Sequence, residues 1–247
     1  MPTKRTSSES IGSGHKSPRD GQRSWASGEE ERLVVLREGI NSRTGWESVM
    51  ELLLESSEAW VISHSRRTEF PALSLDLGFR EHSKLLSGHS LHHYAIATAD
   101  RIKSLSGVQF SSVRLSKHHG NSTSVAVGEA PQWSHRGGAA EVTMTTRRSY
   151  ATPPFVQEVE EATRSFRNIL VPKVPLALHV AYTTGLPRTW SRLWGPTVSG
   201  VCVRPLQNEQ IDSAQIVELG FDHLSIGEQL GHRVQMVISA SRMPSDG

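Results

Sequence analysis

Three histidines in the N-terminal half have the spacing of possible metal ligands. His89 lies three and four residues before His92 and His93, so on a helix it shares a face with at least one of them. Neutral imidazoles in this arrangement can bind zinc. The stretch lacks the glutamate of a His-Glu-x-x-His motif, and His82 or Asp100 would have to supply further ligands. One hypothesis is therefore a metal-dependent hydrolase that uses the three histidines, and the alternative is a helix with polar, stacking histidines.

A second polar set contains His118, His119, Asn121 and His135. The asparagine follows the histidines too closely to leave room for the hairpin and helix of a His-Asn-His nuclease site. The sequence also has no Gly-x-x-x-x-Gly-Lys-Ser/Thr loop, no Gly-x-Gly-x-x-Gly loop and no Gly-x-Ser-x-Gly elbow. Phosphate-binding loops of the common kinds and the serine hydrolase elbow are therefore excluded.

Asp212 is the third candidate for chemistry. It stands in a short turn before an alternating strand, where a carboxylate could hold magnesium against a phosphodiester. Glu218 and Asp222 lie in and after that strand, but paired-metal chemistry normally needs acids from separate elements. The alternative is a turn-forming aspartate whose side chain bonds to its own backbone.

Composition restricts the class of protein. The 247 residues include 27 Lys and Arg against 25 Asp and Glu, a net charge of +2, which alone does not indicate nucleic-acid binding. The single cysteine, Cys202, lies between two valines, which favours a buried thiol in a reducing compartment. No apolar run approaches the roughly 18 residues of a membrane span, and no secretory signal is present. We therefore expect a cytoplasmic protein without membrane association.

The chain divides into four parts. Residues 1–28 are rich in Ser, Gly, Lys and Arg and are expected to form a disordered basic tail. Residues 29–128 form a mixed α/β subdomain without an assigned role, and residues 129–138, with Pro, Gly and Arg, form a linker. Residues 139–247 have the order β-α-β-α-β-β. The expected fold class is therefore α/β (α+β).

Apolar periodicity predicts the elements of both folded parts. The N-terminal part is expected to hold a short helix over 33–40, a helix from Trp46, a strand over 59–63, an edge strand or extended loop over 69–77, a helix over 90–105, and short strands over 108–115 and 124–127. Pro71 restricts the stretch over 69–77 to an edge strand or an extended loop, and Gly107 is placed to cap the helix over 90–105. The C-terminal part is expected to hold a strand over 141–146, a helix opened by Pro153, a strand from Val174, a broken helix over 190–203, and a closing hairpin of strands near 216–221 and 234–238.

This C-terminal order, with Pro196-Thr-Val198 in the broken helix and the run Ile211-Asp-Ser-Ala-Gln-Ile-Val-Glu-Leu219, resembles the RusA-type Holliday-junction resolvases. These are small, homodimeric, magnesium-dependent endonucleases, and the resemblance covers residues 139–247. It implies DNA as a partner, a homodimer, and magnesium as the cofactor of an active member.

The sequence departs from the family at its metal-binding positions. The family's Asp-x-Asp-Asn…Lys motif aligns with Thr189, Ser191, Arg192 and Gly195, and the later pair of aspartates survives only as Asp212 followed by a serine. The resemblance therefore implies a degenerate nuclease fold that binds DNA without cutting it, with Asp212 as the remaining catalytic candidate.

A DNA-binding surface is expected in the broken helix. Arg188 and Arg192, interleaved with Trp190 and Trp194, would supply phosphate contacts and aromatic rings for stacking. The alternative places both tryptophans in the core or in a dimer interface. A self-associating interaction protein with no nucleic-acid role is accordingly the alternative function.

Overall fold

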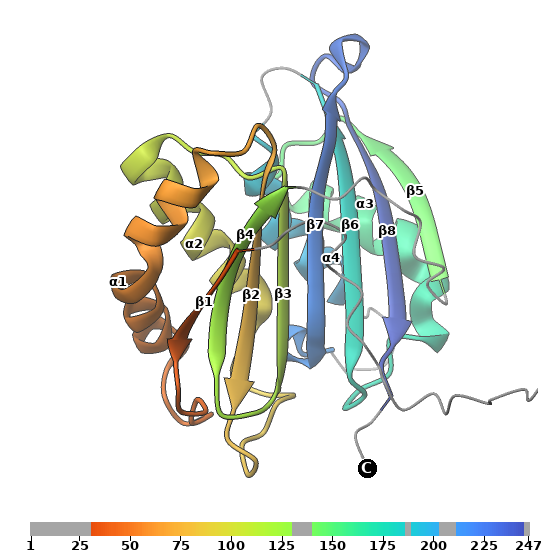
Figure 1. The fold of residues 1–247 in the computed structure, drawn as a ribbon. Coiled ribbons are helices and arrows are strands. Elements are labelled where there is room, and N and C mark those ends of the chain that lie inside the picture. Colours follow the sequence, from red (N-terminus) through yellow and green to blue (C-terminus); the bar gives the residue numbers. More distant parts are fainter. Residues whose placement is uncertain (1–30, 130–139, 186–188, 203–210, 245–247) are drawn as a thin grey trace, which may run out of the picture.

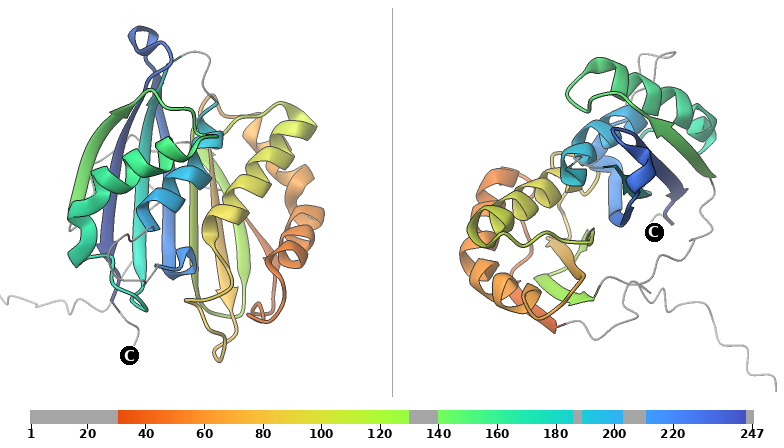
Figure 2. Two further views of the ribbon diagram at one scale, coloured as in Figure 1. Left: turned by 180° about the vertical axis from the view of Figure 1, so that it is seen from behind. Right: turned by 90° about the horizontal axis from the view of Figure 1, so that it is seen from above.

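The protein has an α+β fold built on one eight-stranded mixed sheet (Figure 1). The computed structural model describes residues 31–129, 140–185, 189–202 and 211–244. The predicted tail over 1–28 and the linker over 129–138 lie outside these ranges, except for Glu129. The described helices cover one face of the sheet, as the view from above shows (Figure 2). None of them is long and apolar enough to cross a membrane.

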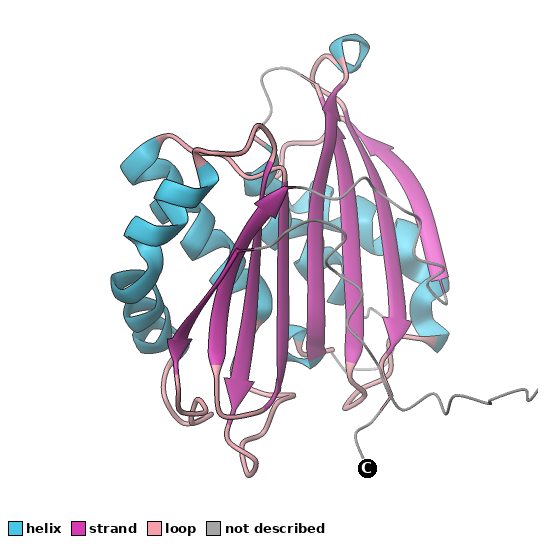
Figure 3. Ribbon diagram, viewed as in Figure 1, coloured by secondary structure: helices cyan, strands magenta, loops and turns pink. Residues whose placement is uncertain are grey.

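The elements follow one another along the chain as two runs of the same kind. Figure 3 shows the strands of both runs side by side in one sheet. The first run is β1 (Glu31–Leu36), α1 (Trp46–Ser65), β2 (Pro71–Phe79), α2 (Leu91–Ser106), β3 (Ser112–His119) and β4 (Thr123–Glu129). The second is β5 (Ala140–Thr146), α3 (Pro153–Ala162), β6 (Leu176–Thr184), α4 (Trp194–Cys202), β7 (Ile216–Ile226) and β8 (Val234–Arg242). Four 3-10 turns lie in the second run: η1 (Thr163–Asn168), η2 (Trp190–Leu193), η3 (Ser213–Gln215) and η4 (Glu228–Leu230).

The two runs are structural repeats. The sheet order is β1-β4-β2-β3-β7-β6-β8-β5. From its outer edge to the centre, the first half has the order β1, β4, β2, β3, and the second half has the corresponding order β5, β8, β6, β7. In both halves the first two pairs from the edge are antiparallel and the third is parallel. The halves join where β3 and β7 pair antiparallel, with Arg114 opposite Gly220. The fold is therefore a tandem repeat with a pseudo-twofold axis between β3 and β7.

The core lies between the sheet and the helices. Alternate residues of each strand face the helices and are buried, as with Leu73, Leu75 and Leu77 of β2. Residues on the opposite face of the central strands are mostly small or polar. This alternation separates an apolar layer under the helices from a polar face that carries no helix of the described ranges (Figure 2).

Several expected elements are confirmed, and four are corrected. The helix over 90–105 is α2, and Gly107 ends it at φ 73°. The expected helix over 33–40 is instead strand β1, and the expected strand over 59–63 is part of α1, because Val61 joins the buried face of that helix. Tertiary packing has overridden the local preference of these residues.

The other two corrections concern strand neighbours. Pro71 does not place its strand at an edge, because β2 lies between β4 and β3, and the proline is only its first residue. Strands β7 and β8 do not form a hairpin, since β6 lies between them and pairs with both. The alternating pattern identified both strands but could not identify their neighbours.

Close packing of α3 on α4 depends on a glycine and gives a testable prediction. A Cβ at Gly200 would lie 2.6 Å from Val159 Cβ and 2.9 Å from Val156 O. We expect Gly200→Ala to lower the free energy of unfolding by about 1–3 kcal/mol through overpacking, as measured by urea denaturation. Gly195→Ala in the same helix is the control, because its Cβ would meet only Ile96 Cδ1 at 3.4 Å. Equal stabilities of the two variants would contradict this account.

Candidate binding site

The three histidines predicted as metal ligands do not converge on one point. His89 is buried, with its Nδ1 2.6 Å from the Tyr94 hydroxyl. His93 packs against the ring of His92 and against Trp46, with centroids 4.2 and 5.0 Å apart. Burial, together with the neighbouring His93, lowers the pKa of His92 to about 4. Among the described residues, no group of three His, Cys, Asp or Glu side chains is placed to hold a metal ion.

Asp212 is exposed and caps a turn. It precedes η3, and its Oδ1 accepts a hydrogen bond of 2.8 Å from the backbone N–H of Ala214. This is the local bond that the turn-forming alternative predicts. Asp222, which lies further along in β7, is held by other residues. The structure therefore does not bring Asp212 together with a set of carboxylates in the described ranges.

Both tryptophans of the expected DNA surface lie in the core. Trp190 and Trp194 are 5% and 1% exposed. Trp190 stacks on His223 at 5.3 Å between ring centroids, and Trp194 stacks on Phe221 at 4.8 Å. Neither indole is available to stack on a base, which corrects that expectation. Arg192 is exposed, and Arg188 lies outside the described residues.

A buried network on the helix-free face joins the two repeats. The carboxylate of Asp222 in β7 accepts a hydrogen bond from Ser112 Oγ at 2.5 Å. Its oxygens also lie 2.7 Å from His179 Nε2 and 3.3 Å from Arg114 Nη2. Burial opposes ionisation of Asp222, but the His179 hydrogen bond and the Arg114 charge outweigh it and lower its pKa. A Cβ at Gly220 would lie 2.6 Å from His179 Cδ2. The network thus fixes the register of β3, β7 and β6, and we assign it a structural role.

A second buried group lies under the helices at the same junction. Lys117 of β3 is 4% exposed, and its ammonium donates to the carbonyl of His89, at 2.8 Å, and to that of Ala214. Burial lowers the pKa of Lys117 to about 7, although the charge of Asp212 acts in the opposite direction. The lysine joins the start of α2 to the turn before β7, so its role is also structural.

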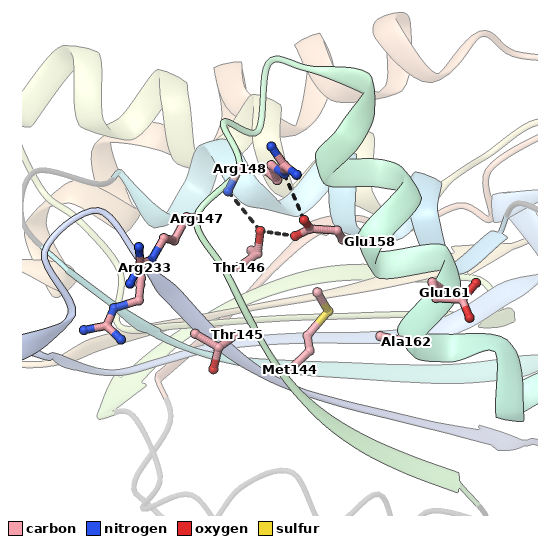
Figure 4. Close-up of a pocket in the computed structure, with 9 residues that line it drawn as sticks. All are labelled: Met144, Thr145, Thr146, Arg147, Arg148, Glu158, Glu161, Ala162 and Arg233. Atoms are coloured by element: carbon pink, nitrogen blue, oxygen red, sulfur yellow. Dashed lines mark hydrogen bonds and ion pairs between the residues drawn. The ribbon is translucent and has the colours of Figure 1, made fainter.

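A cavity of about 720 Å³ lies at the outer edge of the second repeat, and we call it the β5–α3 cavity (Figure 4). It lies where β5 ends, beside α3 and the start of β8. Sequence spacing did not reveal it, because its residues come from three separate segments. The lining residues are Met144, Thr145, Thr146, Arg147, Arg148, Glu158, Glu161, Ala162 and Arg233.

Positive charge exceeds negative charge in the lining, which holds three arginines and two glutamates. Both glutamates have cationic partners. Arg148 Nε lies 2.9 Å from Glu158 Oε1, and Glu161 pairs with Arg164. A hydrogen bond from Thr146 lowers the pKa of Glu158 despite partial burial, and Arg148 adds to this effect. Since the wall's own carboxylates are compensated, the net charge of the lining favours an incoming anion.

Arg233 adds a fixed cation to the cavity. Its Nε donates to the carbonyl of Leu230 at 3.3 Å, and its Nη2 donates to that of Gln229 at 3.1 Å. Carbonyl acceptors hold the guanidinium in place without cancelling its charge. Figure 4 shows Arg233 beside Arg147, on the opposite side of β5 from Glu158. The cationic groups thus lie on both sides of the end of this strand.

Comparisons with known proteins do not define a family. No family model matches the sequence, and the search of curated proteins found no match. One solved structure that the comparison matched is described as "Cyanuric acid hydrolase: evolutionary innovation by structural concatenation". It shares 12% sequence identity over 86% of this chain and 68% of that chain, with a TM-score of 0.22. A likeness at this level carries no argument about the activity of this protein.

Proposed function

We propose that this protein is an interaction protein that recognises an anionic group of its partner in the β5–α3 cavity. The observation that supports the proposal is the presence of Arg147, Arg148 and Arg233 around one cavity of about 720 Å³. Guanidinium groups bind carboxylates and phosphates through paired, charge-assisted hydrogen bonds. The proposal assigns no reaction to the cavity, and it includes the cytoplasmic location predicted from the single cysteine.

DNA association is the second candidate, and the same arginines favour it. A backbone phosphate would also be a suitable ligand for them. However, Glu158 and Glu161 lie in the cavity wall, and Glu141 is exposed further along β5. Arg148 and Arg164 compensate the two cavity carboxylates, whereas Glu141 would repel the next phosphates of a polyanion that runs along β5. A short acidic segment of a protein partner is therefore a better match than a long nucleic acid.

The proposal is tested by measuring the binding of two labelled probes, hexa-aspartate and a 20-base-pair DNA duplex, by fluorescence anisotropy. We expect hexa-aspartate to bind, and we expect Arg147→Ala with Arg233→Ala to weaken its binding by about tenfold, the equivalent of roughly 1.4 kcal/mol. Arg101→Ala is the control, because Arg101 lies on α2 and pairs with Glu58.

Two outcomes would contradict the proposal. One is binding of hexa-aspartate that the double variant leaves unchanged, and the other is no binding at all. DNA association would replace the proposal if the duplex bound more tightly than hexa-aspartate. In that case the slope of log K against log salt concentration should be smaller by about two for the double variant. Sedimentation of the free protein in the same buffers measures its molecular mass in solution and so tests whether it forms the homodimer expected from the sequence.

A further inference from the structure

We infer that the partner of the β5–α3 cavity is an extended peptide segment that adds to the outer edge of β5 as a further strand, with a carboxylate at the arginine end. This inference rests on the proposed function and names the class of partner. Strand addition of this kind takes its affinity from main-chain hydrogen bonds and its specificity from pockets for alternate side chains. Three features of β5 support it.

The first feature is the free edge. Strand β5 is the last in the sheet order, and of the described strands it pairs only with β8, over all seven of its residues. Alternate residues of such a strand direct their N–H and C=O groups away from the sheet. Its sequence, Ala-Glu-Val-Thr-Met-Thr-Thr, has no proline or lysine to block an added strand, and Glu141 is its one charged residue.

The opposite edge of the sheet provides a contrast. Strand β1 has six residues, begins with Glu31 and Arg32, and shifts its register against β4 between Val34 and Leu36. Charges and irregular pairing of this kind protect an edge from further strands. The regular ladder of β5 lacks this protection, so an added strand is expected at β5 and not at β1.

The second feature is an apolar contact beside the free edge. Met144 and Ala162 line the cavity between β5 and α3, and both are partly buried. Figure 4 shows Met144 on the α3 side of the strand and Thr145 on the other side. Alternate side chains of an added strand would therefore contact Met144 and Ala162, while the intervening ones would lie beside Thr145. A segment that alternates valine with threonine suits both faces.

The third feature is a charge difference between the two ends of β5. Arg147 and Arg148 follow the last residue of β5, and Arg233 precedes Val234, which pairs with Thr146. All three arginines therefore gather at one end of the strand. Glu141 lies near the other end. This polarity suits a peptide with an acidic end beside the arginines and a basic or neutral end beside Glu141.

The test uses two amidated seven-residue peptides that alternate valine and threonine. One carries two aspartates at its N-terminal end and a lysine at its C-terminal end, and the other has these ends exchanged. We expect one of them to bind at least about tenfold more tightly than hexa-aspartate. The better orientation shows whether the strand adds antiparallel, with its N-terminal acids near Arg147, or parallel. If the parallel orientation binds better, a version with a free C-terminal carboxylate in place of the aspartates separates the two sources of that group.

N-methylation distinguishes strand addition from simple charge attraction. Methyl groups are placed on alternate amide nitrogens of the better peptide, in one register or in the other. Only one register of amides would face β5, so we expect one methylated peptide to lose binding by about tenfold or more and the other to retain it. Equal affinities of the two methylated peptides and the unmodified one would overturn the inference.

The inference and the proposed function fail in different ways. If Arg147→Ala with Arg233→Ala weakens the peptide but methylation in neither register does, the cavity binds carboxylates and strand addition is wrong. If methylation in one register weakens binding but the arginine variant does not, a strand adds without use of the arginines. Arg101→Ala again serves as the control, and circular dichroism of each variant confirms that it folds.

Discussion

Asp222→Ala is expected to lower the free energy of unfolding by about 3–5 kcal/mol, because it removes the carboxylate that offsets the buried charge of Arg114. Asp222 accepts from Ser112 at 2.5 Å and lies 2.7 Å from His179 and 3.3 Å from Arg114. These contacts cross from β3 and β6 to β7, at the junction of the two repeats. Chemical denaturation of the variant and of the unchanged protein at neutral pH measures the loss.

The pH dependence of this loss has a definite sign. The pKa of Asp222 is lowered from its ordinary value of 3.8 in the folded protein. At a pH between the folded pKa and 3.8, the unfolded chain binds more protons than the folded protein. The contribution of Asp222 to stability is therefore present above pH 3.8 and is lost as the pH falls through the folded pKa. We therefore expect the stability gap between the unchanged protein and Asp222→Ala to narrow in acid.

Glu141→Ala provides the matched control. Glu141 is also on the helix-free face, but it is exposed and belongs to the outer strand. Its replacement is expected to cost less than about 1 kcal/mol, as for other exposed charges. If Asp222→Ala were as stable as Glu141→Ala, the network would not join the repeats, and the Asp222 cluster would have to be considered as a site for a ligand.

Sequence patterns predicted the second repeat better than the first. The order β-α-β-α-β-β for residues 139–247 and the α+β class are confirmed, because strong alternation and the proline pair of α3 mark these elements. The repetition itself was missed. Helix α1 has 20 residues and its counterpart α3 has 10, so no fixed spacing relates the two halves. Strand order was also missed, because alternation defines a face but does not choose a neighbour.

The candidate site was harder to predict than the fold. Residue types alone suggested chemistry for His89 and Trp190, but the fold places both in buried ring contacts. The β5–α3 cavity combines a strand end, a helix and Arg233, which lies 85 residues after Arg148. One signal was present in the sequence: the pair Arg147-Arg148 follows directly after a predicted strand. Only the topology, which puts β8 beside β5, brings Arg233 to the same place.

Raising the pH from 7 to 10 is expected to stabilise this protein relative to Lys117→Met by several kcal/mol. Burial lowers the pKa of Lys117 from 10.5 to about 7. Below pH 7 the lysine is protonated in both states, and the cost of burying its charge is fully present. Between pH 7 and pH 10.5 the unfolded chain binds more protons than the folded protein, so the stability rises with pH. A shift of this size corresponds to an upper value on the order of 5 kcal/mol.

The Lys117→Met variant removes the titrating amine, and of the neighbouring groups His89 also responds, since burial and, after it, the Lys117 charge lower its pKa. Urea unfolding at pH 6.5, 8 and 9.5 should show the difference in stability moving in favour of the lysine as the pH rises. Lys84→Met, at an exposed position, should show no such trend. Methionine cannot donate to the carbonyls of His89 and Ala214, so a constant offset between the proteins is also expected. A difference that stays constant with pH would mean that Lys117 remains charged in the fold, with its charge compensated at the junction of the repeats.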